Sequence, residues 1–219
     1  MASENGDMIN EDWANLSYYK EENLKLVREG IKEGIIFMGD SITEEWGRIM
    51  PEFFSNKQYI NRGIGGQTTP QMLIRFRQDV IDLNPEAVVI LAGTNDIAGN
   101  TGPSSVKMIV DNLMSMAEIA IKQNIQVFMS SILPVFRYPW NKSIIEPFKK
   151  IAEINNFIKD FSNREKLVYV DYHAHMVDSR PGLKSELTTD EVHLNQAGYI
   201  VMSKIVKRVI RDRFKRNLV

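Results

Sequence analysis

Five short runs typical of β-strands alternate with longer segments of helical pattern along the 219-residue chain. The runs cover residues 35–38, 59–61, 87–92, 125–129 and 167–170. The third run is apolar throughout, which is the pattern of a strand covered on both faces. This alternation predicts an α/β fold, a parallel sheet with helices on both faces and right-handed crossovers.

The segments between the runs set the expected helices and the domain organisation. We expect helices over residues 11–29, from 44 onward, and over 70–83, 105–123, 144–163 and 196–216. Thr69 is the expected cap of the third helix, and Asn195 that of the last. Trp13, Leu16, Leu24 and Val27 are the expected apolar contacts of the first helix. With no linker, repeat or low-complexity tract, we predict an N-terminal helical extension, residues 1–30, packed on one domain of residues 31–219.

Composition excludes several classes of protein. The 27 basic and 28 acidic residues give a net charge of -1, so no electrostatic footprint for nucleic acid is present. The absence of cysteine excludes disulfides and sulfur-based zinc sites. No run reaches the ~18 apolar residues that a membrane span needs. Residues 1–6 lack the apolar core of a signal peptide, but a chain whose signal has been removed begins the same way, so secreted and periplasmic locations stay open.

Polar residues follow the predicted strands where each one ends. Ser41 follows the first strand, Gly66 the second and Asn95 the third, while Asp190 and His193 precede the last helix. In a parallel sheet these loops open on one edge, so the side chains can converge. The alternative for Ser41 is a purely structural role, as the cap of the next helix.

The chemistry of these residues is complementary. A serine needs a base to become a nucleophile, and the base needs an acid to fix its tautomer. His193 and Asp190 can supply the two, being three residues apart. The backbone N–H groups of Ser41 and Gly66 and the side-chain amide of Asn95 would then form a three-donor oxyanion hole. We expect glycine at position 66 because a side chain would block close approach of the backbone.

Other motifs that would indicate a different function match the sequence less well. The spacing of Gly34 and Gly39 is that of a phosphate loop, but Asp40 replaces the required lysine. The segment 63–68 begins like a dinucleotide fingerprint but ends in threonine. His173 and His175, with Asp171 beside them, could supply an acid–base pair or two metal ligands, although ordinary packing is the commoner role for such residues.

Candidate substrate contacts are Asp40, Arg62 and Trp140. Trp140 belongs to an aromatic loop, residues 134–140, that follows the fourth strand on the same edge. Its aromatic rings could stack on a sugar face or enclose an acyl group, or they could only fasten a long loop to the domain.

Four sequence blocks together resemble the SGNH, or GDSL, hydrolase family. They are residues 39–43 (GDSIT), 61–69 (NRGIGGQTT), 93–96 (GTND) and 190–193 (DEVH), in the order in which the family has them. The resemblance spans roughly Trp13 to the final helix. It implies a flavodoxin-like three-layer α/β/α sandwich with a five-stranded parallel sheet of order 2-1-3-4-5, and no metal or organic cofactor.

The same resemblance implies roles for individual residues. Ser41 would be the nucleophile, His193 the base, Asp190 the orienting acid, and Gly66 and Asn95 oxyanion donors. Leu194 stands where many members carry proline after the histidine, which changes the local turn but removes no catalytic group.

The likeness is greatest to bacterial acylhydrolases and carbohydrate acetylesterases related to platelet-activating-factor acetylhydrolase. We therefore expect a serine esterase that acts on short acyl, notably acetyl, groups of a small-molecule or saccharide ester. A lysophospholipase or thioesterase with the same residues, or a non-catalytic carbohydrate-binding domain on this scaffold, are the alternatives. The oligomeric state stays open.

Overall fold

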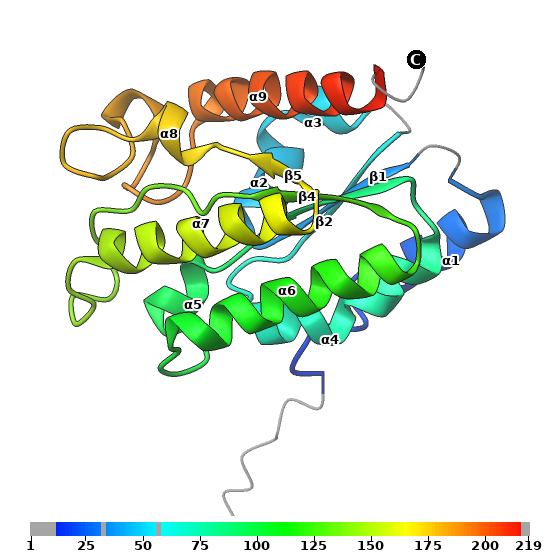
Figure 1. Cartoon of the computed structure of the whole chain (residues 1–219), viewed down its shortest axis with the longest axis horizontal. Coiled ribbons are helices and arrows are strands. Elements are labelled where there is room, and N and C mark those ends of the chain that lie inside the picture. Colours follow the sequence, from blue (N-terminus) through cyan, green and yellow to red (C-terminus); the bar gives the residue numbers. More distant parts are fainter. Residues whose placement is uncertain (1–11, 32–33, 56–57, 216–219) are drawn as a thin grey trace, which may run out of the picture.

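The computed structural model describes residues 12–31, 34–55 and 58–215, and Figure 1 shows its layers. Five parallel strands form one sheet in the order β2-β1-β3-β4-β5. Their bounds are β1 Ile35–Gly39, β2 Tyr59–Gly63, β3 Ala87–Leu91, β4 Gln126–Ser130 and β5 Val168–Val170. The predicted flavodoxin-like order is confirmed. The chain reverses its direction of winding between β1 and β3, which is where sheets of this kind bind their ligands.

Helices cover both faces of the sheet, which confirms the predicted three layers (Figure 1). One face carries α1 (Lys20–Glu29), α4 (Thr69–Asp79), η1 (Ile81–Leu83), α6 (Val106–Lys122) and α7 (Pro147–Arg164). The other carries α2 (Ser41–Ile49), α3 (Pro51–Phe54), α8 (His173–Met176), η2 (Ser185–Leu187) and α9 (Gln196–Lys215). The short helix α5 (Thr94–Ala98) follows β3 at the carboxyl edge. None of these described helices has the length and hydrophobicity that a membrane crossing requires.

The alternation of side chains along the strands divides the core in two. On β1, Ile36 and Met38 belong to the cluster under α4, α6 and α7, whereas Ile35 and Phe37 belong to the cluster under α2 and α9. Burying one large apolar side chain stabilises a fold by about 1.5–3 kcal/mol. The two clusters therefore hold the carboxyl edge of the sheet, and the loops on it, in a fixed frame.

The N-terminal helix is shorter than predicted. Residue 11 lies outside the described residues, residues 12–19 form turns, and α1 begins only at Lys20. The carboxylate of Asp12 accepts hydrogen bonds from the backbone N–H groups of Leu16 and Ser17, and Asn15 has a positive φ of 54°. These local bonds compete with a helix, so the segment turns instead.

The predicted apolar contacts of that helix are wrong. Trp13, Leu16, Leu24 and Val27 are between 38% and 54% exposed. The polar Asn23 is buried instead, with its amide donating to Asp79 Oδ1 at 2.6 Å. Hydrogen bonds to buried charged groups, rather than an apolar stripe, therefore orient α1 on the domain.

Other boundaries differ in detail. Thr68 rather than Thr69 caps α4, and its capping box is completed by Gln71. The helix ends at Asp79 and the remaining turn to Leu83 is a 3₁₀-helix. The short helices α5 and α8 differ from the sequence prediction, which has no helix over these residues. The last helix is described to Lys215, so the predicted end at residue 216 lies outside the described residues.

Side chains occupy the outer edge of β2, the strand at one end of the sheet. The carbonyl of Asn61 accepts from Arg62 Nη1 at 2.6 Å, and that of Gly63 accepts from the hydroxyl of Tyr19 at 2.5 Å. The N–H of Gly63 donates to Asn61 Oδ1 at 2.8 Å. Two carbonyls and one N–H of this edge strand are thus paired within the chain.

Candidate active site

Three side chains that are distant in sequence form a continuous hydrogen-bonded chain at the carboxyl edge of the sheet. Ser41 Oγ lies 3.0 Å from His193 Nε2, although 152 positions separate the two residues. His193 Nδ1 lies 2.7 Å from Asp190 Oδ2. A hydroxyl, an imidazole and a carboxylate in this order can together deprotonate the hydroxyl and stabilise the imidazolium that results.

Ser41 owes its position to the turn from β1 into α2. It is the first residue of α2, and Asp40 rather than Ser41 is the cap, since Asp40 Oδ1 accepts from the N–H of Ile42 at 2.9 Å. Tyr199 of α9 donates its hydroxyl to the carbonyl of Ile42 at 2.9 Å, which fixes the first turn of α2 against the opposite end of the chain. The hydroxyl of Ser41 is thereby left for His193.

Asp40 lies fully buried beneath this turn. Burial raises the pKa of its carboxyl to about 7, against the hydrogen bond from Ile42, while the nearby Asp96 raises it further. Burial likewise raises the pKa of Asp96 to about 6, opposed by hydrogen bonds from Thr69. The turn that carries the nucleophile is therefore close to two carboxyl groups, those of Asp40 and Asp96, whose burial disfavours negative charge.

His193 and Asp190 share one tight turn before α9. Asp190 Oδ1 accepts from the N–H of Val192 at 3.0 Å and from that of His193 at 2.6 Å. Glu191, between them, has a φ of +73°, a conformation that few side chains adopt. Asn195 Oδ1 accepts from the N–H of Gly198 at 3.1 Å, so the predicted cap of the last helix is confirmed. The turn thus points His193 at Ser41 and the carboxylate of Asp190 at His193.

Asp190 is held as an anion. Partial burial disfavours its charge, but hydrogen bonds from the side chain and N–H of His193 and from the N–H of Val192 outweigh this and lower the pKa of Asp190. A carboxylate at Nδ1 keeps the proton on that nitrogen and leaves Nε2 free to accept one from Ser41.

The two predicted oxyanion donors are linked to each other. Asn95 Nδ2 donates to the carbonyl of Gln67 at 3.0 Å, and Asn100 Nδ2 donates both to Asn95 Oδ1 at 3.1 Å and to the carbonyl of Gly66 at 3.0 Å. A side-chain amide has two N–H donors, so Asn95 retains one for a ligand. The backbone conformation gives a further reason for glycine at position 66. A Cβ there would meet only Asn100 Nδ2, at 3.8 Å, whereas φ is +75°, a region that favours glycine.

The aromatic loop is fastened to the domain and borders the hydroxyl–imidazole pair. Tyr138 is buried and donates to the carbonyl of Thr94 at 2.9 Å, which fastens the loop to α5. Trp140 is 50% exposed and stacks on the imidazole of His193, with ring centroids 6.0 Å apart. Arg137, just before Tyr138, forms a two-point ion pair with Glu191, at 2.9 Å and 2.5 Å. The loop is therefore fixed on both sides of the proposed base.

Two of the three predicted substrate contacts are not surface residues. Arg62 is 0% exposed; it donates to Asn23 Oδ1 and Glu22 Oε1, both at 3.0 Å, and so joins α1 to the sheet. Asp40 is equally buried and caps α2. Neither side chain can reach a substrate in this arrangement, because each is enclosed by its structural partners. Trp140 alone of the three borders the site.

The remaining sequence candidates lie in structural positions. His173 and His175 belong to α8; the N–H of His173 donates to Ser131 Oγ and His175 Nδ1 lies 2.8 Å from the carbonyl of Asp171. Burial lowers the pKa of His173. The described residues bring together no set of three or more histidine or acidic side chains that could hold a metal. Trp46 is buried and stacks on Phe53 in the core.

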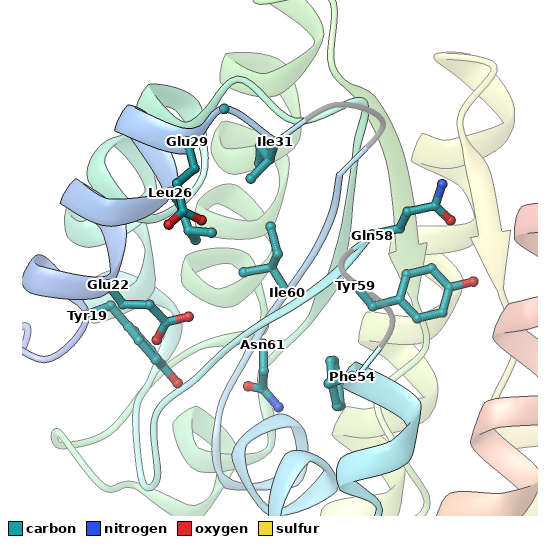
Figure 2. Close-up of a pocket in the computed structure, with 11 residues that line it drawn as sticks. Tyr19, Glu22, Leu26, Glu29, Ile31, Phe54, Gln58, Tyr59, Ile60 and Asn61 are labelled. Carbon is teal, nitrogen blue, oxygen red and sulfur yellow. The ribbon is translucent and has the colours of Figure 1, made fainter.

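A cavity of about 370 Å³ opens beside the hydroxyl–imidazole pair. Six of the eight residues that line it are polar or charged by type; the lining consists of Ser41, Glu45, Arg48, Ile49, Thr189, Asp190, His193 and Leu194. A separate cavity of about 650 Å³ lies between α1 and the edge strand β2, and Figure 2 shows Leu26, Ile31 and Ile60 among its lining residues. No residue proposed for catalysis lines this second cavity. The smaller cavity is therefore the one that can receive a substrate of Ser41.

Two contacts around the site, one of Glu44 and one of Arg137, could not be predicted from the sequence. Glu44 accepts a hydrogen bond from the N–H of Gly65, and Arg137 pairs with Glu191. Each contact joins segments that are far apart in the chain, so no local pattern signals it. The only local sign was an acidic residue in the first turn of the helix after Ser41, which is common in helices generally.

Comparison with known proteins agrees with this geometry. Residues 37–201 match the GDSL-like Lipase/Acylhydrolase family. A solved structure from Bacteroides fragilis is similar at 41% identity and a TM-score of 0.89, covering 92% of this chain and 98% of that one. A GDSL-like lipase from Bacteroides thetaiotaomicron is similar at 39% identity and a TM-score of 0.88, covering 91% and 98%.

A human protein, platelet-activating factor acetylhydrolase IB subunit alpha2, is 24% identical over 188 residues, which cover 80% of this chain and 75% of the human one. The family match spans most of the chain, including Ser41, Asn95 and His193. The chain therefore belongs to the GDSL-like lipase/acylhydrolase family and is a carboxylic ester hydrolase.

Proposed function

We propose that this protein is a serine esterase in which Ser41 attacks the ester carbonyl, His193 acts as general base and acid, and Asp190 orients His193. The observation that carries the proposal is the unbroken series of contacts from Ser41 Oγ to His193 Nε2, at 3.0 Å, and from His193 Nδ1 to Asp190 Oδ2, at 2.7 Å. A triad is recognised by such geometry rather than by sequence order.

The reaction takes two steps through a covalent intermediate. His193 Nε2 takes the proton of Ser41 as Oγ bonds to the carbonyl carbon, and the tetrahedral oxyanion accepts from the N–H groups of Ser41 and Gly66 and from Asn95 Nδ2. His193 then protonates the leaving alcohol as the acyl–alcohol bond breaks. Water, deprotonated by His193, attacks the acyl-enzyme, and Ser41 recovers its proton as the acid leaves.

The surroundings of Ser41 favour an ester with a short acyl group and a polar alcohol, such as an acetylated saccharide. Of the eight residues that line the adjoining cavity, only Ile49 and Leu194 are apolar. A long acyl chain needs a largely apolar wall, whereas hydroxyl-rich ligands pair with groups such as Glu45 and Arg48. The exposed ring of Trp140 beside His193 provides a face on which a sugar ring can stack. The similar human protein is by name an acetylhydrolase.

The test is hydrolysis of a short activated ester together with covalent labelling by a fluorophosphonate. We expect the wild-type protein to do both and Ser41→Ala to do neither, with its thermal stability intact. Acetylated xylo-oligosaccharides and lysophospholipids are then compared as substrates, with acetylated oligosaccharides preferred. Near-normal ester hydrolysis by Ser41→Ala would remove Ser41 from the mechanism. A preference for long-chain lysophospholipids would instead leave the mechanism standing and replace the substrate class.

A further inference from the structure

The N-terminal segment, residues 12–29, contacts the loop that carries Gly66. One contact runs through a single carboxylate: the hydroxyl of Tyr18 donates to Glu44 Oε1, and the N–H of Gly65 donates to Glu44 Oε2 at 2.9 Å. Glu44 belongs to α2, three positions after Ser41. A bridge of this kind couples the N-terminal segment, the helix of the nucleophile and the glycine loop.

A second contact holds the other side of the same loop. The side chain of Gln67 is buried, and its Nε2 donates to the carbonyl of Ala14 at 2.8 Å. Its Oε1 accepts from Arg75 Nε at 2.5 Å, and its backbone carbonyl accepts from Asn95 Nδ2 at 3.0 Å. Both neighbours of Gly66 are thus fixed, the one at 65 by Glu44 and the one at 67 by the N-terminal segment and Arg75.

Gly66 has no side chain of its own that could restrain the orientation of its backbone N–H. Its φ of +75° is open to glycine, and its carbonyl, which belongs to the following peptide plane, accepts from Asn100 Nδ2 at 3.0 Å. The peptide plane between residues 65 and 66 decides where the N–H of Gly66 points. The bond from Gly65 to Glu44 holds the preceding part of the backbone, so losing it frees that plane to rotate. Donors in an oxyanion hole act because they are oriented before the reaction, and displacements of about 1 Å can cost about 100-fold in rate.

We propose that Glu44, held by Tyr18, is a positioning residue that orients the N–H of Gly66 toward the oxyanion. The inference rests on the function proposed above, since it assigns a source to the geometry of the oxyanion hole. It also makes the segment before α1 part of the catalytic structure, rather than an extension that only packs on it. Glu44 touches neither the substrate nor the reacting atoms in this role, and its effect passes through Gly65.

The experiment compares Glu44→Ala with a matched control, Gln78→Ala. Gln78 Nε2 donates to the carbonyl of Leu16 at 2.6 Å, so it fastens the same N-terminal segment to α4 without contacting the glycine loop. We measure kcat, KM and thermal stability for both, and the rate of fluorophosphonate labelling, which forms a tetrahedral adduct at Ser41. For Glu44→Ala we expect kcat and the labelling rate to fall by about 10- to 100-fold with KM within about 3-fold of wild type, because the donor matters most in the transition state.

Glu44→Gln retains an acceptor oxygen for Gly65, so we expect its kcat to stay within about 3-fold of the wild-type value. Equal kcat values in Glu44→Ala and Gln78→Ala, or an equal loss in Glu44→Gln and Glu44→Ala, would overturn the inference. If Glu44→Ala does not fold, Tyr18→Phe replaces it in the comparison. For Tyr18→Phe we expect kcat to fall by about 3-fold at an unchanged KM. An unchanged kcat in this variant would contradict the inference. Loss of Ser41-dependent labelling in the wild type would instead sink the proposed function, so the two failures are distinct.

Discussion

The indole of Trp140 lies over the imidazole of His193, with ring centroids 6.0 Å apart and planes at 30°. The two rings come from loops after β4 and before α9, and the ion pair of Arg137 with Glu191 joins the same two loops. The stack covers one face of the proposed base, while half of the indole surface faces solvent.

This stack leads to a prediction about substrate binding. We expect Trp140→Ala to lower kcat/KM on an acetylated oligosaccharide by about 2- to 10-fold, since an aromatic contact contributes roughly 0.5–1.5 kcal/mol. Trp140→Phe keeps a ring over the imidazole and should retain most of the activity. Steady-state kinetics on the saccharide and on a small aryl acetate check this, and wild-type values for Trp140→Ala on both substrates would contradict it.

The hydrogen-bonded amide of Asn95 is the basis of a second prediction. Asn95→Ala removes one proposed oxyanion donor, and the loss of one such donor slows turnover by about 10²–10³-fold. Single-turnover measurements should place the loss in the acylation step rather than in substrate binding. Asn112→Ala is a control, because Asn112 donates to Thr69 Oγ1 and not to the donors around Ser41. Similar rates in the two variants would exclude Asn95 from the oxyanion hole.

Asp40 gives a prediction about pH. Its pKa is raised to about 7 by burial in the folded protein, against about 3.9 in an unfolded chain. As the pH rises, the unfolded chain releases this proton first, so the free energy of unfolding falls between about pH 4 and pH 7. Below about pH 4 the contribution of Asp40 is fully present, and above about pH 7 it is lost.

Asp40→Asn removes the titration and keeps an acceptor for the N–H of Ile42. From pH 4 to pH 8 the stability of the variant relative to wild type should therefore rise, by at most about 4 kcal/mol, since one pKa unit corresponds to about 1.4 kcal/mol. Urea denaturation at both pH values measures the difference. Asp82→Asn, at an exposed position of η1, is the matched control. A relative stability of Asp40→Asn that stays constant across this range would refute the prediction.

Gly63 is expected to be essential for packing rather than for catalysis. A Cβ at this position would lie 2.2 Å from the backbone nitrogen of Glu44 and 2.8 Å from the carbonyl oxygen of Asp40. Gly63→Ala must therefore push α2 away from β2, at a cost of roughly 2–4 kcal/mol. At Gly30, where a Cβ meets nothing within 4 Å, substitution by alanine should cost only about 1 kcal/mol for its positive φ. Thermal and urea unfolding of the two variants test the contrast.

The strands and their polar ends could be predicted from the sequence because their signals are local. Four of the five strands coincide with apolar runs that are bounded by glycine or polar residues. The order of the strands in the sheet could be predicted from the family resemblance. The approach of Ser41 and His193 could be predicted as well, since parallel strands end on one edge.

The N-terminal segment could not be predicted, because its support is not an apolar stripe. Three glutamines hold its backbone carbonyls: Gln67 binds Ala14, Gln71 binds Trp13 and Gln78 binds Leu16. Glutamine in a helix is usually a solvated residue, so these partners become visible only in three dimensions. The structural role of Arg62 could not be predicted for the same reason, because its partners Glu22 and Asn23 come from a helix about 40 positions earlier.

The paired outer edge of β2 has a consequence for how the protein behaves at high concentration. A neighbouring molecule that approached this strand would find the carbonyls of Asn61 and Gly63 already bonded to Arg62 and Tyr19. At the opposite end of the sheet, β5 offers only three residues. Copies of the enzyme are therefore less able to extend the sheet through β2, and Arg62, one of the side chains that occupies this edge, also joins α1 to the sheet.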